Sequence, residues 1–464
     1  MKKLFCLLLV FSLHLSDGQE KAAQIDQLLT MLHDQSQFNG NVLIVHKGQT
    51  LLNKSYGLAN RTLRNELNKN TVFELASLSK QFTATGIVLL HRQGMLAYTD
   101  KLTKYFPELK FADKVLIKNL LNLSSGLPEY FGPMMEASRA NAFATNPDVV
   151  KMLAMQVDSL AFEPNERFAY CNTNYVLLAS IIEKVANTSY HDFMQMHVFG
   201  PLGMSQTSIV NSRYQPQDLP NYAVGYVQGE RQQITEPDSL PYYDYVRYLD
   251  GIVGDGMVKS TVIDLRKWHQ AIRDHALLNK DEFQFMSQLD TLNDGSLNTY
   301  SFGWNFRKTD ANQIMLHTGG WPGYVNYIGR SVNEDNLVVI LQNFDEVVLP
   351  IKAINEILDG KPVSIHYKKE IQLTDSELAQ FVGTYMEGDD RENITRLTLG
   401  KNALIFNSTA NTWDMPIYPD SEITFFSKAP RMNLGFKFEQ TDDGLKLLFL
   451  QSGKRIGEAK KMKD

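Results

Sequence analysis

The chain has 464 residues, of which 43% are hydrophobic and 11% aromatic, so it can bury a large core and is long for a single domain. Its formal net charge of -6 is mildly acidic, which argues against nucleic acid as a partner. Two domains are therefore our first expectation.

Residues 1–18 are typical of a signal peptide, because two lysines precede an apolar run and small or polar residues suited to cleavage lie near Gly18. The apolar run is shorter than the roughly 20 residues that a membrane-spanning helix needs, and no later segment is apolar enough to cross a bilayer. We expect a secreted or periplasmic protein with no integral membrane segment once the leader is removed. Because Cys6 leaves with the leader, Cys171 has no partner within the chain, and we interpret it as a small buried residue.

The predicted elements place strands at both ends of residues 19–365, with helices between them. A helical pattern, "AAQIDQLLTMLHDQ", is followed by two strands that turn at residues 47–48, and helical patterns dominate residues 71–289. The β-type runs "QIMLHTGG", "YVNYIGRS" and "NLVVILQNF" come next, and the amphipathic helix "PIKAINEILDG" ends at Gly360. This order predicts an α+β domain in which an antiparallel sheet, completed by both ends of the domain, is flanked by helices and carries an inserted helical subdomain.

The pattern changes in residues 371–464, where short β-type runs recur at intervals of roughly ten residues. Such spacing is typical of a small antiparallel barrel, and we predict a lipocalin-like C-terminal domain with its boundary near Ile371. The predicted strands are residues 383–386, 396–400, 403–407, 423–427, 435–440 and 446–451.

A Ser-x-x-Lys pair, Ser77 and Lys80, lies at the expected start of a helix in "FELASLSKQFTATG". Positions three apart share a helix face, so the hydroxyl and the amine can come within hydrogen-bond reach. An amine activates a serine only where burial or nearby positive charge keeps part of it neutral. The pair alone is also consistent with a solvated helix face, since about two such spacings are expected by chance in this length. The spacing occurs nowhere else in the chain.

Two further motifs follow in chain order, Tyr170-Cys171-Asn172 and then His317-Thr318-Gly319-Gly320. The order Ser-x-x-Lys, Tyr-x-Asn and His-Thr-Gly resembles the serine β-lactamase and penicillin-binding-protein superfamily. The Tyr-x-Asn form resembles the branch that contains class C β-lactamases, DD-carboxypeptidases, D-aminopeptidases and esterases. The resemblance covers residues about 25 to 360 and includes the local matches "LLNLSSGLPEY" at 120–130, "PLGMSQT" at 201–207 and "YSFGW" at 300–304.

The resemblance implies three catalytic residues. Ser77 would be the nucleophile and Lys80 would take its proton. Tyr170 would shuttle protons and help to activate the deacylating water. No cofactor and no metal ion is implied.

The resemblance also implies a substrate-binding set. Asn172 would orient the substrate amide and Lys80, and the backbone N–H groups of Ser77 and Gly320 would hold the oxyanion. The remaining members of the set are His317, Thr318 and Gly319. His317 stands where classical β-lactamases and transpeptidases carry lysine, and a histidine with a reference pKa of about 6.5 is mostly neutral at pH 7. We therefore expect weak recognition of a substrate carboxylate.

The same residues allow other interpretations. An α/β-hydrolase would show Gly-x-Ser-x-Gly and a zinc peptidase would show His-Glu-x-x-His, and the chain contains neither. A second Tyr-x-Asn at residues 324–326 follows the third motif, so the order selects Tyr170. Tyr170 is also consistent with a core tyrosine at a helix start, and His317 with a structural histidine at a sheet edge. The tyrosines of residues 242–248 either wall a substrate cleft or pack the core.

Taken together, the motifs predict an exported serine hydrolase that forms an acyl-enzyme on Ser77. The expected partner is a small-molecule or peptide substrate, such as a D-amino-acid peptide of cell-wall origin or an ester. Two alternatives stay open: a class C-like β-lactamase, and a non-catalytic penicillin-recognising binding or sensor protein.

Overall fold

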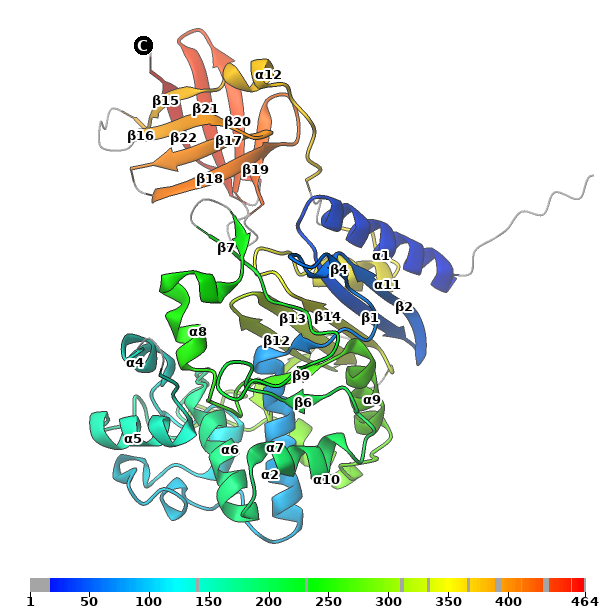
Figure 1. Cartoon of the computed structure of the whole chain (residues 1–464), viewed down its shortest axis with the longest axis vertical. Helices are drawn as coiled ribbons and strands as arrows, with labels where there is room; N and C mark the ends of the chain where they lie inside the picture. Colours follow the sequence, from blue (N-terminus) through cyan, green and yellow to red (C-terminus); the bar gives the residue numbers. More distant parts are fainter. Residues whose placement is uncertain are drawn as a thin grey trace, which may run out of the picture.

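The structure is a computed structural model that describes residues 17–138, 142–229, 233–308, 313–331, 334–364, 368–388, 394–409, 411–428, 434–451 and 453–462. A mixed helix-and-sheet part is followed by a C-terminal barrel at one end of the molecule (Figure 1). Of the predicted signal peptide, residues 1–16 lie outside the described residues, and Asp17 and Gly18 begin the first helix. None of the described helices combines the length and the apolar character that a membrane span requires.

The first part is built around an antiparallel sheet that has seven strands within the described residues. Strand β1, near the N-terminus, pairs with β14, so that Leu43 lies opposite Val339. This pairing confirms that the two ends of the domain complete one sheet. The strands, in spatial order, are β10 (Tyr300–Ser301), β11 (Trp304–Lys308), β12 (Gln313–Trp321), β13 (Tyr324–Ser331), β14 (Leu337–Gln342), β1 (Gly40–His46) and β2 (Gln49–Tyr56).

The two faces of this sheet belong to different parts of the core, because successive side chains of a strand point to opposite sides. Val42 and Ile44 of β1 pack on one face with α1 (Asp17–Asp34) and α11 (Ile351–Leu358). Leu43 and Val45 point to the other face, into the larger cluster that includes α2 (Lys80–Arg92) and α9 (Val262–Arg273). The sheet is therefore covered by helices on both sides.

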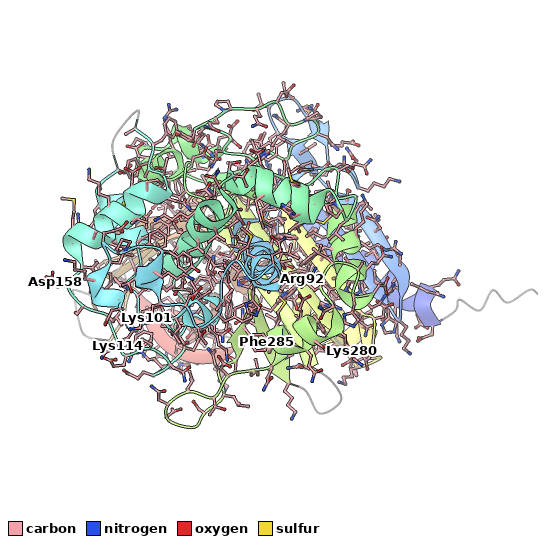
Figure 2. The ribbon with its side chains drawn as sticks, turned by 90° about the horizontal axis from the view of Figure 1, so that it is seen from below. Arg92, Lys101, Lys114, Asp158, Lys280 and Phe285 are labelled. Carbon is pink, nitrogen blue, oxygen red and sulfur yellow. The ribbon has the colours of Figure 1, made fainter. Side chains whose placement is uncertain are left out.

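Helix α2 runs through the middle of the helical region (Figure 1), and Lys80 to Leu90 are all buried in it. Its last residue, Arg92, donates from Nε to Glu282 of α10 (Lys280–Ser287) at 2.6 Å, at the end of the molecule shown in Figure 2. The other helices of this region are α3 (Ile117–Leu121), α4 (Phe131–Glu136), α5 (Asn146–Gln156), α6 (Thr173–Ala186), α7 (Tyr190–Met194) and α8 (Asp244–Tyr248).

Short strands connect the helical region to the sheet. The most important for the site is β9 (Val258–Ser260), which lies between β5 (Phe73–Glu74) and β6 (Ser208–Ile209). Two further pairs are β3 (Leu58–Asn60) with β4 (Asn65–Glu66), and β7 (Val227–Gln228) with β8 (Ile234–Thr235).

The C-terminal part is a closed antiparallel barrel, with eight strands within the described residues. Residues Leu378 and Phe381, in and just after α12 (Asp375–Ala379), pack into its core. The barrel was predicted, but β18 and β22 were not among the six predicted strands. The strands are β15 (Gly383–Met386), β16 (Ile394–Gly400), β17 (Ala403–Ser408), β18 (Asn411–Pro419), β19 (Thr424–Ser427), β20 (Leu434–Thr441), β21 (Gly444–Gln451) and β22 (Lys454–Lys461).

Candidate active site

Ser77 lies where strand β5 turns into a short 3-10 helix, Ala76–Ser79, that continues directly into α2. The residue before it, Ala76, has a φ of 50°, a left-handed conformation that non-glycine residues seldom adopt and that is often found at functional sites. Both residues line a cavity of about 170 Å³. The turn therefore presents the serine to an open space at the start of a buried helix.

Lys80 is fully buried, and its ammonium nitrogen has three oxygen neighbours. Nζ lies 3.0 Å from Ser77 Oγ, 2.8 Å from Asn172 Oδ1 and 2.8 Å from the carbonyl oxygen of Asp255. The amide oxygen and the carbonyl oxygen can only accept hydrogen bonds, so they take two N–H groups of Lys80. The remaining position faces the serine hydroxyl. A protonated lysine donates there, and a neutral lysine can accept the serine proton there.

The side-chain amide of Asn172 is held in one orientation by its neighbours. Its backbone N–H and its Nδ2 both donate to Glu129 Oε2, at 2.7 and 3.1 Å. Because a carboxylate accepts hydrogen bonds, Nδ2 must face Glu129 and Oδ1 must face Lys80. Glu129 therefore fixes the amide group of Asn172, and the oxygen of that amide fixes the ammonium group of Lys80.

Two carboxyl groups at this site, Glu129 and Asp255, were not predicted from the sequence. Burial raises the pKa of Glu129 above its ordinary value, against the opposing effect of hydrogen bonds from backbone N–H groups. Burial also raises the pKa of Asp255, although Lys80 and a hydrogen bond from Tyr130 lower it. The sequence did contain a signal for Glu129, because it lies within the "SSGLPEY" match. No motif or spacing indicated Asp255.

Tyr170 is brought to the same place by the segment that leads into α6. The centroid of its ring lies 5.2 Å from Lys80 Nζ and 6.1 Å from the ring of His317. The side chain is 43% exposed, so it stands at the surface of the site and not within the core. The Ser-x-x-Lys, Tyr-x-Asn and His-Thr-Gly motifs are thus close together in space.

His317 is buried behind the cavity and does not line it. Its Nδ1 lies 2.6 Å from the carbonyl oxygen of Thr318, which can only accept, so Nδ1 carries the hydrogen. In the neutral ring Nε2 is then an acceptor, and the hydroxyl of Tyr300 lies 3.2 Å from it. Burial, with a smaller effect from Lys80, lowers the pKa of His317 to about 3. The ring is neutral at physiological pH.

The end of strand β12 forms one edge of the site. Strand β11 pairs with β12 only as far as Leu316, and among the described residues the following segment has a partner strand on one side alone. Thr318 and Gly320 are exposed there, and Gly320 lines the cavity with Ser77. Gly319 faces inward, where a Cβ atom would lie 2.2 Å from the carbonyl oxygen of Leu75. This contact brings the strand edge directly against the serine turn.

Aromatic and aliphatic side chains form the opposite wall of the cavity. Phe131 and Trp321 line it, with ring centroids 6.0 Å apart, together with Leu249 and Ile252. Tyr245 packs against both aromatic rings from behind, at 5.6 and 6.0 Å. Tyr245 of the tyrosine-rich segment 242–248 thus supports the wall, whereas Tyr242 is exposed. Within the described residues, no group of His, Cys, Asp or Glu is arranged to hold a metal ion.

Known proteins resemble this chain in sequence and in fold. The family model described as Beta-lactamase matches residues 25–355. Penicillin-binding protein 4* of Bacillus subtilis (strain 168) is 35% identical over 444 residues, which covers 93% of this chain and 97% of that protein.

Solved structures share the fold. The octameric penicillin-binding protein homologue from Pyrococcus abyssi has a TM-score of 0.64 at 21% identity, covering 95% of this chain and 99% of that one. The D-amino acid amidase from Ochrobactrum anthropi SV3 has a TM-score of 0.59 at 23% identity, covering 72% of this chain and 96% of that one. The family match and the 35% identical relative together show that the chain belongs to the beta-lactamase family, within the serine β-lactamase and penicillin-binding-protein superfamily.

Proposed function

We propose that the protein is a serine hydrolase that cleaves amide or ester bonds of small substrates through an acyl-enzyme on Ser77. The observation that carries this proposal is the 3.0 Å contact between Lys80 Nζ and Ser77 Oγ, with the other neighbours of Nζ fixed as acceptors. Neutral Lys80 takes the serine proton as Oγ forms a bond to the substrate carbonyl carbon. The carbonyl oxygen gains negative charge, which N–H groups of Ser77 and Gly320 stabilise.

Breakdown of the tetrahedral intermediate breaks the bond to the leaving group. The proton held by Lys80 passes to that group, with Tyr170 as the shuttle between them. Water then attacks the acyl carbon and gives a proton to the same pair of residues. The bond between that carbon and Oγ breaks, which releases the acid, and the proton returns to Oγ and restores Ser77. The position of Tyr170, beside Lys80 and partly exposed, supports its role in these proton transfers, because the leaving group and the water both lie on the solvent side of the site.

The substrate class that we propose is a small amide or ester, such as a D-amino-acid amide or peptide, and not a β-lactam. The likeness to the fold of a D-amino acid amidase is consistent with amides, and the apolar wall suits a hydrophobic side chain. Recognition of a carboxylate beside the scissile bond has little support, because His317 is neutral and no lysine, arginine or histidine lines the described cavity. We also propose that the protein is exported, on the composition of residues 1–18.

The test is active-site labelling together with a substrate panel. Intact-protein mass spectrometry after treatment with a fluorophosphonate should show one adduct, located on a peptide that contains Ser77. Ser77→Ala should abolish the adduct, and Ser205→Ala, at an exposed serine, should not. A labelled Ser77→Ala variant would remove the proposed nucleophile.

The panel separates the alternatives. It contains a neutral p-nitrophenyl ester, a D-aminoacyl p-nitroanilide and nitrocefin. We expect turnover of the ester or the anilide and poor turnover of nitrocefin. A kcat/KM for nitrocefin above about 10⁶ M⁻¹s⁻¹ would make the protein a β-lactamase. A single burst of acylation without turnover on any substrate would make it a binding or sensor protein.

A further inference from the structure

The segment 249–257 borders two different cavities. Leu249 and Ile252 line the active-site cavity, whereas Gly251 and Val253 line a second cavity of about 410 Å³. The two cavities share no lining residue among the described part of the chain. The second cavity is therefore a separate space, and it is larger than the one beside the catalytic serine.

Asn146, at the start of α5, fixes one wall of the second cavity. Its side chain is 3% exposed and binds both backbone groups of Val253. Nδ2 donates to the carbonyl oxygen of Val253 at 3.1 Å, and Oδ1 accepts from its N–H at 2.8 Å. Nδ2 also lies 3.1 Å from the carbonyl oxygen of Val176. The shape of this wall is thus set by the fold, as in the preformed pockets that bind small molecules.

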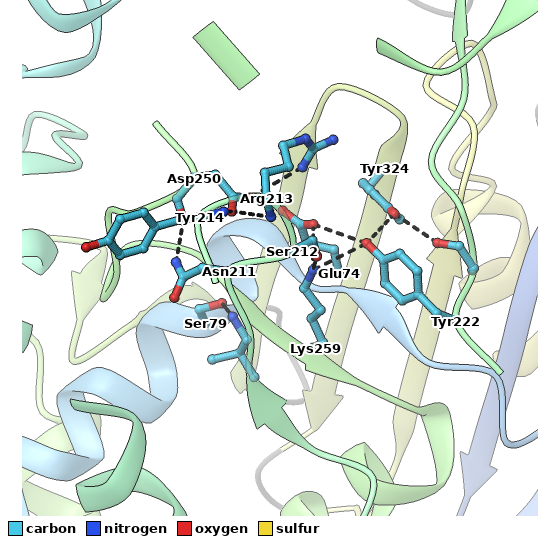
Figure 3. Close-up of polar contacts among 12 residues, drawn as sticks. Glu74, Ser79, Asn211, Ser212, Arg213, Tyr214, Tyr222, Asp250, Lys259 and Tyr324 are labelled. Atoms are coloured by element: carbon cyan, nitrogen blue, oxygen red, sulfur yellow. Dashed lines mark hydrogen bonds and ion pairs between the residues drawn. The ribbon is translucent and has the colours of Figure 1, made fainter. Parts of the chain in front are cut away.

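A second wall comes from the loop that contains Tyr214. The buried carboxylate of Asp250 accepts from the backbone N–H groups of Arg213 and Tyr214 through Oδ2, at 2.7 and 2.9 Å. Asn211 donates from Nδ2 to the carbonyl oxygen of Asp250 (Figure 3). The ring of Tyr214 points away from this network and is 39% exposed, and the residue lines the second cavity (Figure 3). A fixed backbone therefore presents an accessible aromatic ring.

The charged groups of the second cavity do not suit an anion. Its described lining residues include Glu183, Asp192 and His191, and no lysine or arginine. Asp192 is already bound, because it accepts from Ser189 Oγ at 2.7 Å and lies 3.0 Å from His191 Nδ1. Glu183 accepts the backbone N–H of Tyr190 at 2.9 Å through Oε1, and burial raises its pKa above the ordinary value. Glu183 is thus the acidic group that a ligand can meet with a hydrogen-bond donor.

The other polar groups of the lining both donate and accept hydrogen bonds. Gln215 and Gln217 bring exposed side-chain amides, each with an oxygen acceptor and two N–H donors. An apolar ligand would remove these groups from water without replacing its hydrogen bonds. A small amine would use the carboxylate but neither the amides nor the aromatic ring. A neutral sugar fits all three, because its hydroxyl groups donate and accept and its C–H face packs on an aromatic ring.

We propose that the second cavity binds a neutral saccharide, which stacks on Tyr214 and forms hydrogen bonds with Glu183, Gln215 and Gln217. The inference does not depend on the proposed hydrolysis, because none of these residues lines the active-site cavity.

The test is a titration of the full chain with cellobiose, maltose and N,N′-diacetylchitobiose, followed by saturation-transfer NMR and calorimetry. At least one disaccharide should bind with a dissociation constant of about 1 mM or tighter. Ethanolamine is the cationic comparison and should not bind. Binding of no disaccharide, or of ethanolamine alone, overturns the proposal.

Two variants locate the bound sugar. Tyr214→Ala removes the stacking ring and should weaken binding about tenfold, as truncation of a central aromatic contact does. Glu183→Gln keeps an oxygen for the N–H of Tyr190 but removes the charge, and it should also weaken binding about tenfold. Tyr242→Ala and Glu163→Gln, at an exposed tyrosine and an exposed carboxylate, are the matched controls and should bind as the wild type does.

Circular dichroism melting curves show whether each variant is folded. Wild-type affinity in folded Tyr214→Ala and Glu183→Gln places the sugar elsewhere and overturns the proposal. Repeating the titration after fluorophosphonate treatment separates the two cavities, because the adduct on Ser77 fills the active-site cavity alone. The affinity should be unchanged, and a loss of binding would assign the sugar to the cavity beside Ser77.

Discussion

Lys80 Nζ lies 3.0 Å from Ser77 Oγ, and its other two hydrogen bonds end on oxygens that cannot donate. Of its three hydrogen-bond partners, the serine is therefore the one with which the lysine can exchange a proton. Lys80→Arg should keep the charge and remove the base, because arginine is not deprotonated in proteins. We expect kcat to fall about 10²- to 10⁴-fold, the usual contribution of a general base.

Stopped-flow acylation with a p-nitrophenyl ester measures this effect directly. Lys114→Arg, at an exposed lysine that pairs with Glu163, is the control and should be unchanged. Wild-type acylation in a folded Lys80→Arg variant would contradict the role of Lys80 as the base.

Glu129 should act through Asn172 and not through the substrate. Glu129→Gln replaces a carboxylate that accepts two N–H groups of Asn172 with an amide that can turn its own N–H toward them. We expect kcat to fall roughly tenfold to a hundredfold with KM nearly unchanged, since a hydrogen bond to a charged group contributes about 1.5–3 kcal/mol.

Glu129→Asp should recover part of the lost rate, because it restores the negative charge at a shorter reach. A purely structural role would lower the melting temperature of both variants and leave kcat of the folded fraction intact. Differential scanning fluorimetry beside steady-state kinetics separates the two cases.

The neutral state of His317 can be observed by NMR. With its pKa lowered to about 3 by burial and by Lys80, the ring should not titrate between pH 5 and 8. The ¹⁵N shifts of the imidazole should correspond to the form that carries hydrogen on Nδ1, the nitrogen that faces the carbonyl oxygen of Thr318. A midpoint near pH 6.5 for this residue would contradict the buried geometry.

The same shift makes stability depend on pH. Above about pH 6.5, the reference value for histidine, His317 is neutral in both the folded and the unfolded chain. Its contribution to the free energy of unfolding is then fully present. As the pH falls toward about 3, the unfolded chain binds a proton that the folded chain does not, and stability is lost. Between pH 7 and pH 5 this amounts to about 2 kcal/mol. In urea unfolding, His317→Gln should reduce the loss of stability between pH 7 and pH 5 by that amount. The pKa of His269 is also lowered, but its effect is the same in both proteins and cancels in the comparison.

The barrel should be dispensable for hydrolysis of a small ester. Its core, which includes Leu378, Phe381 and Tyr385, shares no residue with the two clusters that flank the central sheet. A chain that ends at Ser364 should fold and retain kcat/KM for a neutral ester within about threefold, as separate cores allow. A folded but inactive truncation would mean that the barrel contributes to the site.

Much of the fold could be predicted because local patterns and global packing agree. The β-type runs that predicted β1 and β14 are continuously apolar, and both faces of these strands are buried, one in each of the two clusters that flank the sheet. Strand β22 was missed because "KRIGEAKK" has no apolar alternation; it is a strand because it pairs with β21 and closes the barrel on β15. Strand β18 contains Pro416 and Pro419, which disfavour a strand in any local reading.

At the site, the motifs predicted which residues meet but not which of them reach the cavity. Ser77, Asn172 and Gly320 line it, whereas Lys80 and His317 lie behind it. Spacing along the chain carries no information about depth, which is set by packing between distant segments. Asp255 shows this most clearly, since the group that it offers to Lys80 is its backbone carbonyl, which every residue possesses.

The contact between Gly319 and the carbonyl oxygen of Leu75 limits how the protein can change. A Cβ atom at this position would meet that oxygen at 2.2 Å, so any side chain would push the strand and the serine turn apart by about 1 Å. That displacement would separate two halves of one reaction centre while leaving each half intact. In a saturation library we expect position 319 to accept glycine alone, whereas Leu249 and Ile252 tolerate exchange. Substitutions that change specificity can therefore occur at the wall of the cavity, whereas the contact between Gly319 and Leu75 tolerates none.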